Sequence, residues 1–287
     1  MSGEQCSGDC KHCSAKEKEN QADCELKRAL AGIRRKIVVM SGKGGVGKST
    51  VAVNLACALA SRGYRTGLLD VDVHGPSIPT MFGLENFQPD TLDDKLLPAE
   101  ACGVKVMSVG FLLEEPDTPV IWRGPAKIGV IRQFFTEVAW GELDFLVIDC
   151  PPGTGDEPLS VCQSVAEGGA GLIVTTPQRV SSADVAKSVN FCRKLDFPIC
   201  GILENMSGFV CPKCGEVTEI FASGAGEELA RRYEIPFLGK LPIEPGICAG
   251  GDRGKPFTVA APESVSAKAF APAVEAVAKT LPSIPLR

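Results

Sequence analysis

Short, almost continuous apolar runs alternate along this chain with longer segments whose apolar residues recur at helical spacing. The runs predict buried strands at Lys36–Ser41, Thr66–Val71, Val104–Val109, Phe145–Ile148, Gly171–Thr175 and Ile199–Leu203. The amphipathic segments predict helices at Ser49–Ser61, Lys127–Val138, Ala183–Leu195, Gly226–Tyr233 and Ser264–Leu281, the last bent or broken at Pro272. Apolar strands that alternate with amphipathic helices predict an α/β fold, in which helices cover both faces of a mostly parallel sheet.

The first 34 residues differ from the rest. They are rich in Cys, Lys, Glu and Asp and hold few large apolar side chains. Such a leader cannot bury enough apolar surface to fold alone, so we expect it to be disordered unless a bound metal orders it. No internal repeat or long linker interrupts the remainder. We therefore predict a leader at residues 1–34 and one domain at residues 35–287.

Composition narrows the function classes. Hydrophobic residues make up 44% and charged residues 23% of the chain, as in ordinary globular proteins. A net charge of −5 argues against general nucleic-acid binding. Residues 1–11 are polar, so no secretory signal is expected, and no apolar stretch reaches the roughly 18 residues of a membrane span. The sequence thus predicts a cytoplasmic protein that binds neither membrane nor nucleic acid.

A phosphate-binding loop lies between the first predicted strand and the first predicted helix. Residues 42–49 fit the pattern G-x-x-x-x-G-K-[ST] in the context that this motif requires. Glycines let backbone N–H groups surround phosphate oxygens, and the helix N-terminus adds positive potential. We expect Lys48 to contact the β- and γ-phosphates and Ser49 to bind Mg²⁺. The predicted nucleotide-binding residues of the loop are Gly44, Gly45, Val46, Gly47, Lys48, Ser49 and Thr50.

An additional lysine stands early in this loop. Lys43 has no role in cradling the phosphates of its own site. It is therefore either a solvated surface residue or a residue with a separate function. The string from Lys43 to Thr50 resembles the deviant Walker A loop of the family that includes nitrogenase iron protein and the MinD and ParA ATPases. This resemblance implies that Lys43 is catalytic and reaches across a dimer interface to the partner's nucleotide. It also implies an ATP-dependent homodimer.

Two acidic stretches follow predicted strands, where open α/β sheets place their ligands. In residues 69–77 we assign Asp72 to the attacking water, with Asp70 as the alternative. In residues 145–156 we expect Asp149 to hold the Mg²⁺ shell and Gly153 to sense the γ-phosphate through its N–H. The competing interpretation is that either aspartate only caps a turn or a helix. Positioning and charge neutralisation are the main requirements of phosphoryl transfer, so these residues suffice for hydrolysis.

Thirteen cysteines add a second chemistry. Cys211 and Cys214 form a C-x-x-C pair. A structural zinc site needs four ligands, and the candidates Cys200 and Cys248 lack the usual spacing. A redox pair is expected in a different strand–helix context. Two chains that contribute two thiolates each would supply the four ligands of a [4Fe–4S] cluster, which is the interpretation we favour.

Longer motifs make the resemblance closer. The segment Asn205–Gly215, together with Asp72–Pro79 and Asp149–Asp156, resembles the signature of Mrp-like iron–sulfur carrier ATPases over about residues 36–261. The resemblance implies a carrier or scaffold that receives a cluster from a donor and passes it to apo-proteins, with slow ATP turnover. It also implies that Asn205 contacts the adenine; otherwise this residue caps a turn.

The remaining cysteines fall into two groups. Four in the leader, which could hold a second cluster, are Cys6, Cys10, Cys13 and Cys24. The cytosolic nucleotide-binding branch of the family also has four N-terminal cysteines, but the spacing differs there from the spacing in this chain, and the difference concerns Cys6 and Cys24 more than Cys10 and Cys13. Zinc, with His12 as a ligand, and an unstructured tail are the alternatives. Cysteines that stand singly among apolar residues, and are expected in the core, are Cys57, Cys102, Cys150, Cys162, Cys192 and Cys200.

Two other functions fit parts of the sequence. A positioning ATPase of the MinD or ParA kind would use a basic amphipathic C-terminal helix on membranes, but residues 264–287 are rich in alanine and poor in cations. An ATP-gated electron-transfer reductase would also share a cluster across a dimer, but it takes its two cysteines from separated parts of the chain.

Overall fold

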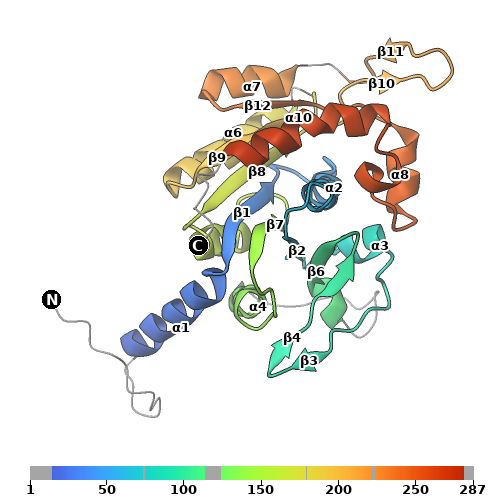
Figure 1. Ribbon diagram of the computed structural model, residues 1–287. Helices are drawn as coiled ribbons and strands as arrows, with labels where there is room; N and C mark the ends of the chain where they lie inside the picture. The colour runs from blue at the N-terminus through green and yellow to red at the C-terminus, as the bar shows by residue number, and fades with distance from the viewer. Residues whose placement is uncertain (1–14, 74, 114–123, 179, 222–223, 281–287) are drawn as a thin grey trace.

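The computed structural model describes residues 15–73, 75–113, 124–178, 180–221 and 224–280. Its centre is an eight-stranded sheet in the order β12-β9-β8-β1-β7-β2-β6-β5 (Figure 1). The strands are β1 (Ile33–Met40), β2 (Thr66–Asp70), β5 (Ala99–Ala101), β6 (Val104–Ser108), β7 (Leu143–Asp149), β8 (Gly169–Thr175), β9 (Ile199–Glu204) and β12 (Phe237–Lys240). All neighbours are parallel except β5 and β6. The predicted mostly parallel sheet is therefore confirmed.

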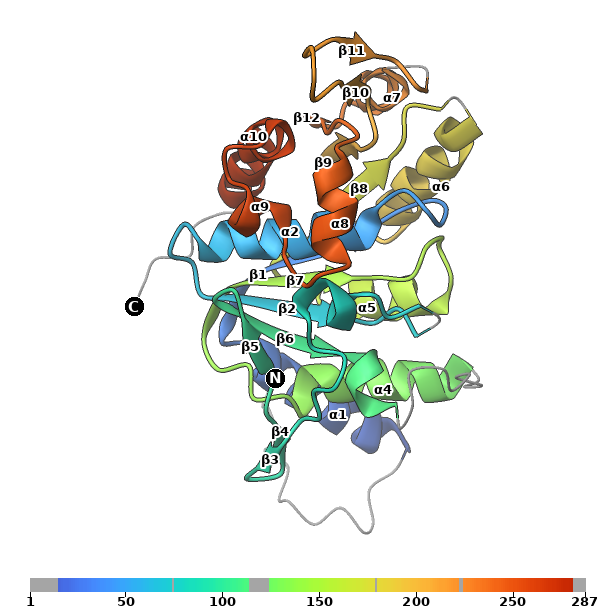
Figure 2. The same cartoon turned by 90° about the vertical axis from the view of Figure 1, so that its right-hand side faces the viewer.

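Helices cover both faces, as predicted. Figure 2 shows α2 and α10 on one side of the central strands and α4 and α5 on the other. The helices are α1 (Ala15–Leu30), α2 (Lys48–Ala60), α3 (Ile78–Phe82), α4 (Gly124–Thr136), α5 (Asp156–Ser164), α6 (Val180–Lys194), α7 (Ala225–Tyr233), α8 (Pro245–Gly251), α9 (Phe257–Ala260) and α10 (Val265–Thr280), with a 3₁₀ turn η1 (Val109–Leu112). Helix α10 continues through Pro272. Among the described residues, no helix is both long and apolar enough to cross a bilayer.

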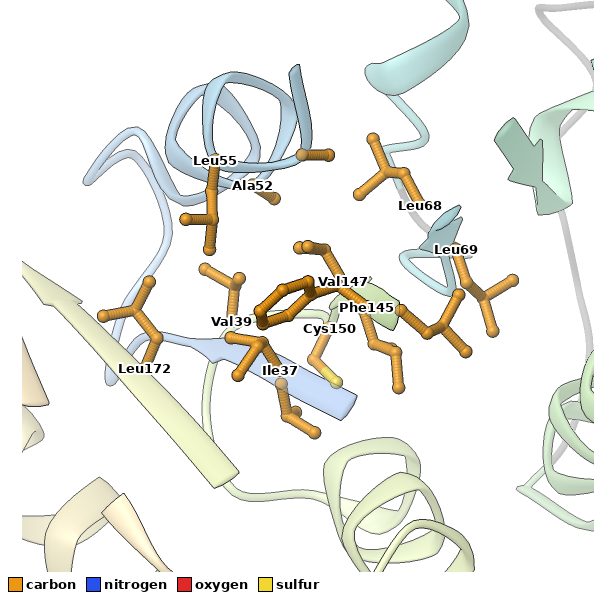
Figure 3. Close-up of a cluster of buried hydrophobic side chains, with 14 of the residues drawn as sticks. Ile37, Val39, Ala52, Leu55, Leu68, Leu69, Phe145, Val147, Cys150 and Leu172 are labelled. Carbon is orange, nitrogen blue, oxygen red and sulfur yellow. The ribbon is translucent and has the colours of Figure 1, made fainter. Parts of the chain in front are cut away.

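The core lies between the central strands and α2. Every residue of β8 is buried, and so are the last five of β1, because helices exclude water from both faces of the sheet. Figure 3 shows side chains of α2, among them Ala52 and Leu55, facing Val39 and Val147 of the sheet. This packing fixes the strand ends that carry the polar residues described below.

The leader differs from the expectation. Its second half forms α1, which packs against α4, whereas residues 1–14, with Cys6, Cys10 and Cys13, lie outside the described part of the chain. Leu26 and Leu30 stand four residues apart on one face and are buried in the core, and Asp23 pairs with Arg132 of α4. Two leucines sufficed because the domain supplies the rest of the apolar surface. The division at residue 34 stays a prediction, although α1 now links the two parts.

One scattered cysteine was placed wrongly. Five of the six expected core cysteines are buried, but Cys102 is exposed. It lies with Gly103 in the two-residue turn between the antiparallel strands β5 and β6, and both residues have positive φ, at 51° and 74°. In this turn the residue as a whole is exposed, although the Cys102 thiol forms a hydrogen bond with the thiol of the buried Cys57. Two other hairpins, β3–β4 (Thr91–Leu92, Lys95–Leu96) and β10–β11 (Phe209–Val210, Val217–Thr218), flank the main sheet.

Candidate functional site: a phosphate loop and a cysteine hairpin

Parallel strands bring the predicted site residues to one edge of the sheet. Strand β1 leads into the phosphate loop, β2 ends at Asp70, β7 ends at Asp149 and β9 is followed by Asn205. Asp149 is level with Asp70 on one side and with Val39 on the other. Because these strands run in the same direction, their carboxyl ends form one crevice, where such sheets bind ligands.

The phosphate loop encloses a cavity of about 240 Å³. Gly45 and Gly47 adopt positive φ of 75° and 78°, which lets the backbone curl before α2 begins at Lys48. The cavity is lined by Ser41, Lys43, Gly44, Gly45, Gly47, Lys48, Ser49, Thr50, Asp72, Ser77, Met81 and Pro152. The side chain of Val46 is buried instead. The arrangement fits a phosphate chain at a helix N-terminus.

Lys48 and Asp149 form a buried ion pair at the base of this cavity. Lys48 Nζ donates to Asp149 Oδ1 at 2.6 Å and to Ser49 Oγ at 3.3 Å. Burial disfavours the lysine charge, but attraction to Asp149 outweighs it and raises the pKa of Lys48. Asp149 Oδ2 is buried without a hydrogen-bond donor among the described residues. A hard cation beside the hydroxyl of Ser49 would satisfy that oxygen, so the residues fit Mg²⁺.

Asp70 and Asp72 occupy different environments. Asp70 is fully buried and accepts hydrogen bonds from the backbone N–H of Asp72 at 3.0 Å and from Ser108 Oγ at 2.9 Å. Burial, and next the charge of Asp149, raise the pKa of Asp70 to about 8. Asp72 lines the phosphate cavity. Asp70 is thus occupied in shaping the loop, while Asp72 faces the space that a nucleotide would take.

Two groups expected to act on a nucleotide, Lys43 on that of the partner and Gly153 on that of its own chain, contact the protein instead. Lys43 Nζ donates to Gln178 Oε1 at 3.2 Å, so this lysine lies against its own chain. The Gly153 N–H donates to the carbonyl oxygen of Ser41 at 2.8 Å. For either group to reach a phosphate, its present hydrogen bond must break. The two contacts therefore describe a state in which neither group acts on a nucleotide.

A larger cavity of about 590 Å³ adjoins the phosphate loop. Asn205 lies between the two, and its Nδ2 donates to the carbonyl oxygen of Val46 at 2.8 Å. The apolar residues of the cavity include Met81, Met206, Leu241, Pro242, Ile243 and Phe257. An apolar cavity with a few polar groups is typical of a site for a nucleoside. The sequence analysis missed this wall because β12, which leads into residues 241–243, is too short and glycine-interrupted to be recognised.

The cysteine pair lies on the β10–β11 hairpin, at the edge of the molecule in both views (Figures 1 and 2). The N–H of Cys211 donates to Glu216 O at 2.9 Å, and the N–H of Gly215 donates to Cys211 O at 2.8 Å. These two hydrogen bonds fix the backbone of the turn that carries both cysteines. Cys214 is exposed and Cys211 half-buried. Backbone N–H groups of Cys214 and Lys213 favour the thiolate and lower the pKa of Cys211. An accessible thiolate is the form that binds metal.

Comparison with known proteins identifies the family of this chain. The model of the family ParA, described as NUBPL iron-transfer P-loop NTPase, matches residues 32–278. This chain belongs to that family. An iron–sulfur cluster carrier protein of Methanocaldococcus jannaschii is 47% identical over 89% of this chain and 91% of its own length. The cytosolic Fe-S cluster assembly factor NUBP2 of Rattus norvegicus is 45% identical over 89% and 96%.

A solved structure shows the same fold. The nucleotide-binding protein of Archaeoglobus fulgidus, in complex with ADP, superposes with a TM-score of 0.73 at 44% identity and covers 82% of this chain and 92% of that protein. The present chain is therefore a member of a P-loop NTPase family with a nucleotide-binding relative of the same fold. The resemblance to the Mrp-like carriers, expected from the motifs, is confirmed.

The other cysteines do not complete a metal site with the hairpin in the described part of the NUBPL-family fold. There, no three His, Cys, Asp or Glu side chains gather to hold a metal. Cys200, considered as a zinc ligand, is buried in β9 and donates to Gly171 O at 3.1 Å. Cys24 is exposed on α1, at the opposite end of the molecule from the hairpin (Figure 1). Cys6, Cys10 and Cys13 lie outside the described residues.

Replacing Gly47 with alanine is expected to weaken ADP binding by about tenfold or more. A Cβ there would lie 2.2 Å from Asn205 Nδ2 and would displace that side chain from Val46, a loss of one buried hydrogen bond. The measurement is calorimetric titration with ADP. The matched control is Gly63→Ala, which has positive φ of 86° and no atom within 4 Å of the added Cβ. Equal ADP affinities of the Gly47 variant and the wild type would contradict this role of Asn205.

Proposed function

We propose that this protein is an ATP-dependent carrier that binds a [4Fe–4S] cluster as cargo between two copies of the chain and transfers it to apo-proteins. The observation that carries the proposal is the cysteine hairpin. It presents two thiols, at Cys211 and Cys214, on the same chain as a phosphate loop with the additional lysine Lys43. A [4Fe–4S] cluster takes four thiolates, so one chain supplies half of the ligands.

The exposure of the hairpin favours a cargo site over a permanent one. Cys214 is exposed, and the hairpin also carries Val217 at 65% exposure. Transfer would proceed by ligand exchange: a thiolate of the recipient binds an iron as the thiolate of Cys211 or Cys214 leaves it, with no change in electron count. Accessible ligands allow that exchange, whereas buried ligands would prevent the recipient's approach.

The crevice residues support ATP hydrolysis. Lys48 would exchange part of its contact with Asp149 for the β- and γ-phosphates, and Asn205 would contact the adenine. Ser49 and Asp149 would hold Mg²⁺, which neutralises phosphate charge when bound. Asp72, which lines the phosphate cavity, would orient the attacking water. Gly153 would exchange its bond to Ser41 for the γ-phosphate, so that this loop reports the nucleotide state.

The dimer is proposed to form around the nucleotides. Lys43 would leave Gln178 and reach the phosphates bound by the partner, where its charge would stabilise the transition state. This completes a site that one chain leaves incomplete and makes hydrolysis dependent on dimerisation. Slow turnover is expected, since Lys43 must first break its hydrogen bond to Gln178 and Gly153 its hydrogen bond to Ser41.

The named relatives fit this proposal. They include an iron–sulfur cluster carrier protein and a cytosolic Fe-S cluster assembly factor, so we also propose a cytosolic location and a separate cluster donor. The leader cysteines Cys6, Cys10, Cys13 and Cys24 are proposed to hold a second cluster. A positioning ATPase would leave the hairpin thiols without a role, and a reductase would favour ligands shielded from exchange.

The test is transfer from the full-length protein. The protein is reconstituted anaerobically with iron and sulfide, separated from free ions, and mixed with an apo-protein that needs a [4Fe–4S] cluster. Activation of the recipient in the presence of an iron chelator supports a carrier. Activation that the chelator abolishes would mean release of free iron and would refute it.

A further inference from the structure

A buried carboxylate lies at the base of the cysteine hairpin. Glu204, the last residue of β9, is fully buried. Its Oε1 accepts hydrogen bonds from Ser207 Oγ at 2.7 Å and from the N–H of Gly224 at 3.2 Å. Its Oε2 accepts from the N–H of Gly226 at 2.7 Å. Ser207 precedes the hairpin, whereas Gly224 and Gly226 follow it, so one side chain holds both ends of the segment that carries the thiols.

The backbone around Glu204 reinforces this attachment. Gly226 stands in the first turn of α7, and a Cβ at that position would lie 3.1 Å from Glu204 Oε2 and 3.0 Å from Thr175 Cγ2. The carboxylate is also close to the helix N-terminus, whose potential favours a negative charge. Glycine at position 226 therefore permits a contact that a larger residue would lengthen. The three bonds satisfy a buried charge that would otherwise be costly.

The same segment touches the nucleotide crevice. Asn205, next in the chain, contacts Val46 of the phosphate loop. Met206 adopts φ of 58°, unusual for a side chain other than glycine, and lines the larger cavity. A Cβ at Gly47 would lie 3.7 Å from Met206 Cε. Residues 204–207 thus connect the two sites: Glu204 and Ser207 hold the hairpin segment, and Asn205 contacts the phosphate loop.

Resting on the proposed function, we infer that Glu204 is a positioning residue that couples the nucleotide site to the cysteine hairpin. A shift of Asn205 and Met206 on nucleotide binding moves the carboxylate, and the carboxylate moves Ser207 and Gly224 at the two ends of the hairpin. Cys211 and Cys214 then change their accessibility with the nucleotide state. Glu204 lines neither the phosphate cavity nor the larger cavity, so we expect it to act on the thiols through the segment that it holds and not through direct contact with the nucleotide.

The coupling is measured as alkylation of Cys211 and Cys214 by iodoacetamide in the apo-protein, followed by peptide mass spectrometry. Rates are compared with and without a non-hydrolysable ATP analogue and Mg²⁺. For the wild type we expect the two rates to differ by about fivefold or more. Glu204→Gln replaces one acceptor oxygen by a donor amide, so the rate ratio should fall towards one while the analogue still binds. Ser207→Ala removes a single bond and should give an intermediate ratio.

The matched control is Glu227→Gln, an exposed glutamate of α7 that pairs with Lys240 at the surface. It should keep the wild-type ratio.

A wild-type ratio in Glu204→Gln, or no nucleotide effect in the wild type, overturns the inference. If Glu204→Gln does not fold, as judged by circular dichroism, Ser207→Ala decides: a wild-type ratio overturns the inference. Iron content after reconstitution separates the two proposals, because a wild type without iron refutes the carrier, whatever the alkylation ratios show.

Discussion

Replacing Cys211 and Cys214 together with alanine is expected to remove the hairpin's iron completely. In a background where the four leader cysteines are serine, the parent protein should bind about four irons per two chains, and the double variant none, because no other thiolate can complete the set. The exposed hairpin has no third ligand among the described residues. The measurement is iron and sulfide analysis after anaerobic reconstitution and desalting.

The serine background is preferable to removing the leader. Leu26 and Leu30 of α1 are buried in the core, so a chain that begins after α1 would expose apolar surface and lose stability. The control for loss of a thiol is Cys102→Ala, an exposed cysteine in the β5–β6 turn. Retention of four irons by the double variant, or stoichiometric zinc in the parent, would refute the bridging site.

Lys43→Ala is expected to lower the rate of ATP hydrolysis by about 10²–10³-fold, which is the usual cost of removing one group that stabilises transition-state charge. ADP affinity should stay near the wild-type value, because Lys43 contacts Gln178 and its proposed target lies on the partner. Phosphate release and ADP titration measure the two quantities separately. A loss in turnover without a loss in binding is the signature of a group that acts in the transition state.

A control for surface charge is Lys187→Ala, which removes an exposed lysine that pairs with Asp184. It should hydrolyse ATP at the wild-type rate. A second experiment tests the action across the dimer: an excess of a Lys48→Ala chain, which cannot bind the phosphates but retains Lys43, should restore turnover at sites whose own chain carries Lys43→Ala. Full activity of Lys43→Ala alone would contradict the proposed sandwich dimer.

The sheet could be predicted from the sequence because its strands are buried on both faces. Strands β1, β7 and β8 each contain a short apolar run without the spacing of an amphipathic helix. Helix α1 could not be predicted in the same way, since its sequence holds only two large apolar residues, Leu26 and Leu30, and their burial depends on packing against the rest of the domain, including α4. Short elements such as β12 owe their structure to a neighbouring strand, which local sequence does not contain.

The site was predictable to the extent that it follows strand ends. Lys48, Asp149 and Asn205 lie in one crevice because parallel strands deliver them there. Glu204 gave no signal, because a glutamate after an apolar strand is ordinarily expected at the surface, and its three partners come from both sides of the hairpin. Hydrogen bonds donated by backbone N–H groups cannot be predicted from residue types, because every residue except proline carries that group.

The most direct test of the carrier account is the rate of cluster transfer under nucleotide control. Full-length reconstituted protein is mixed with an apo-recipient and an iron chelator, with no nucleotide, with ATP and Mg²⁺, or with the non-hydrolysable analogue. The account predicts that the recipient is activated despite the chelator, at a rate that depends on which nucleotide is present, and that Cys211→Ala/Cys214→Ala transfers nothing from this site. Activation that is equally fast in all three conditions, or that disappears with the chelator, would contradict it.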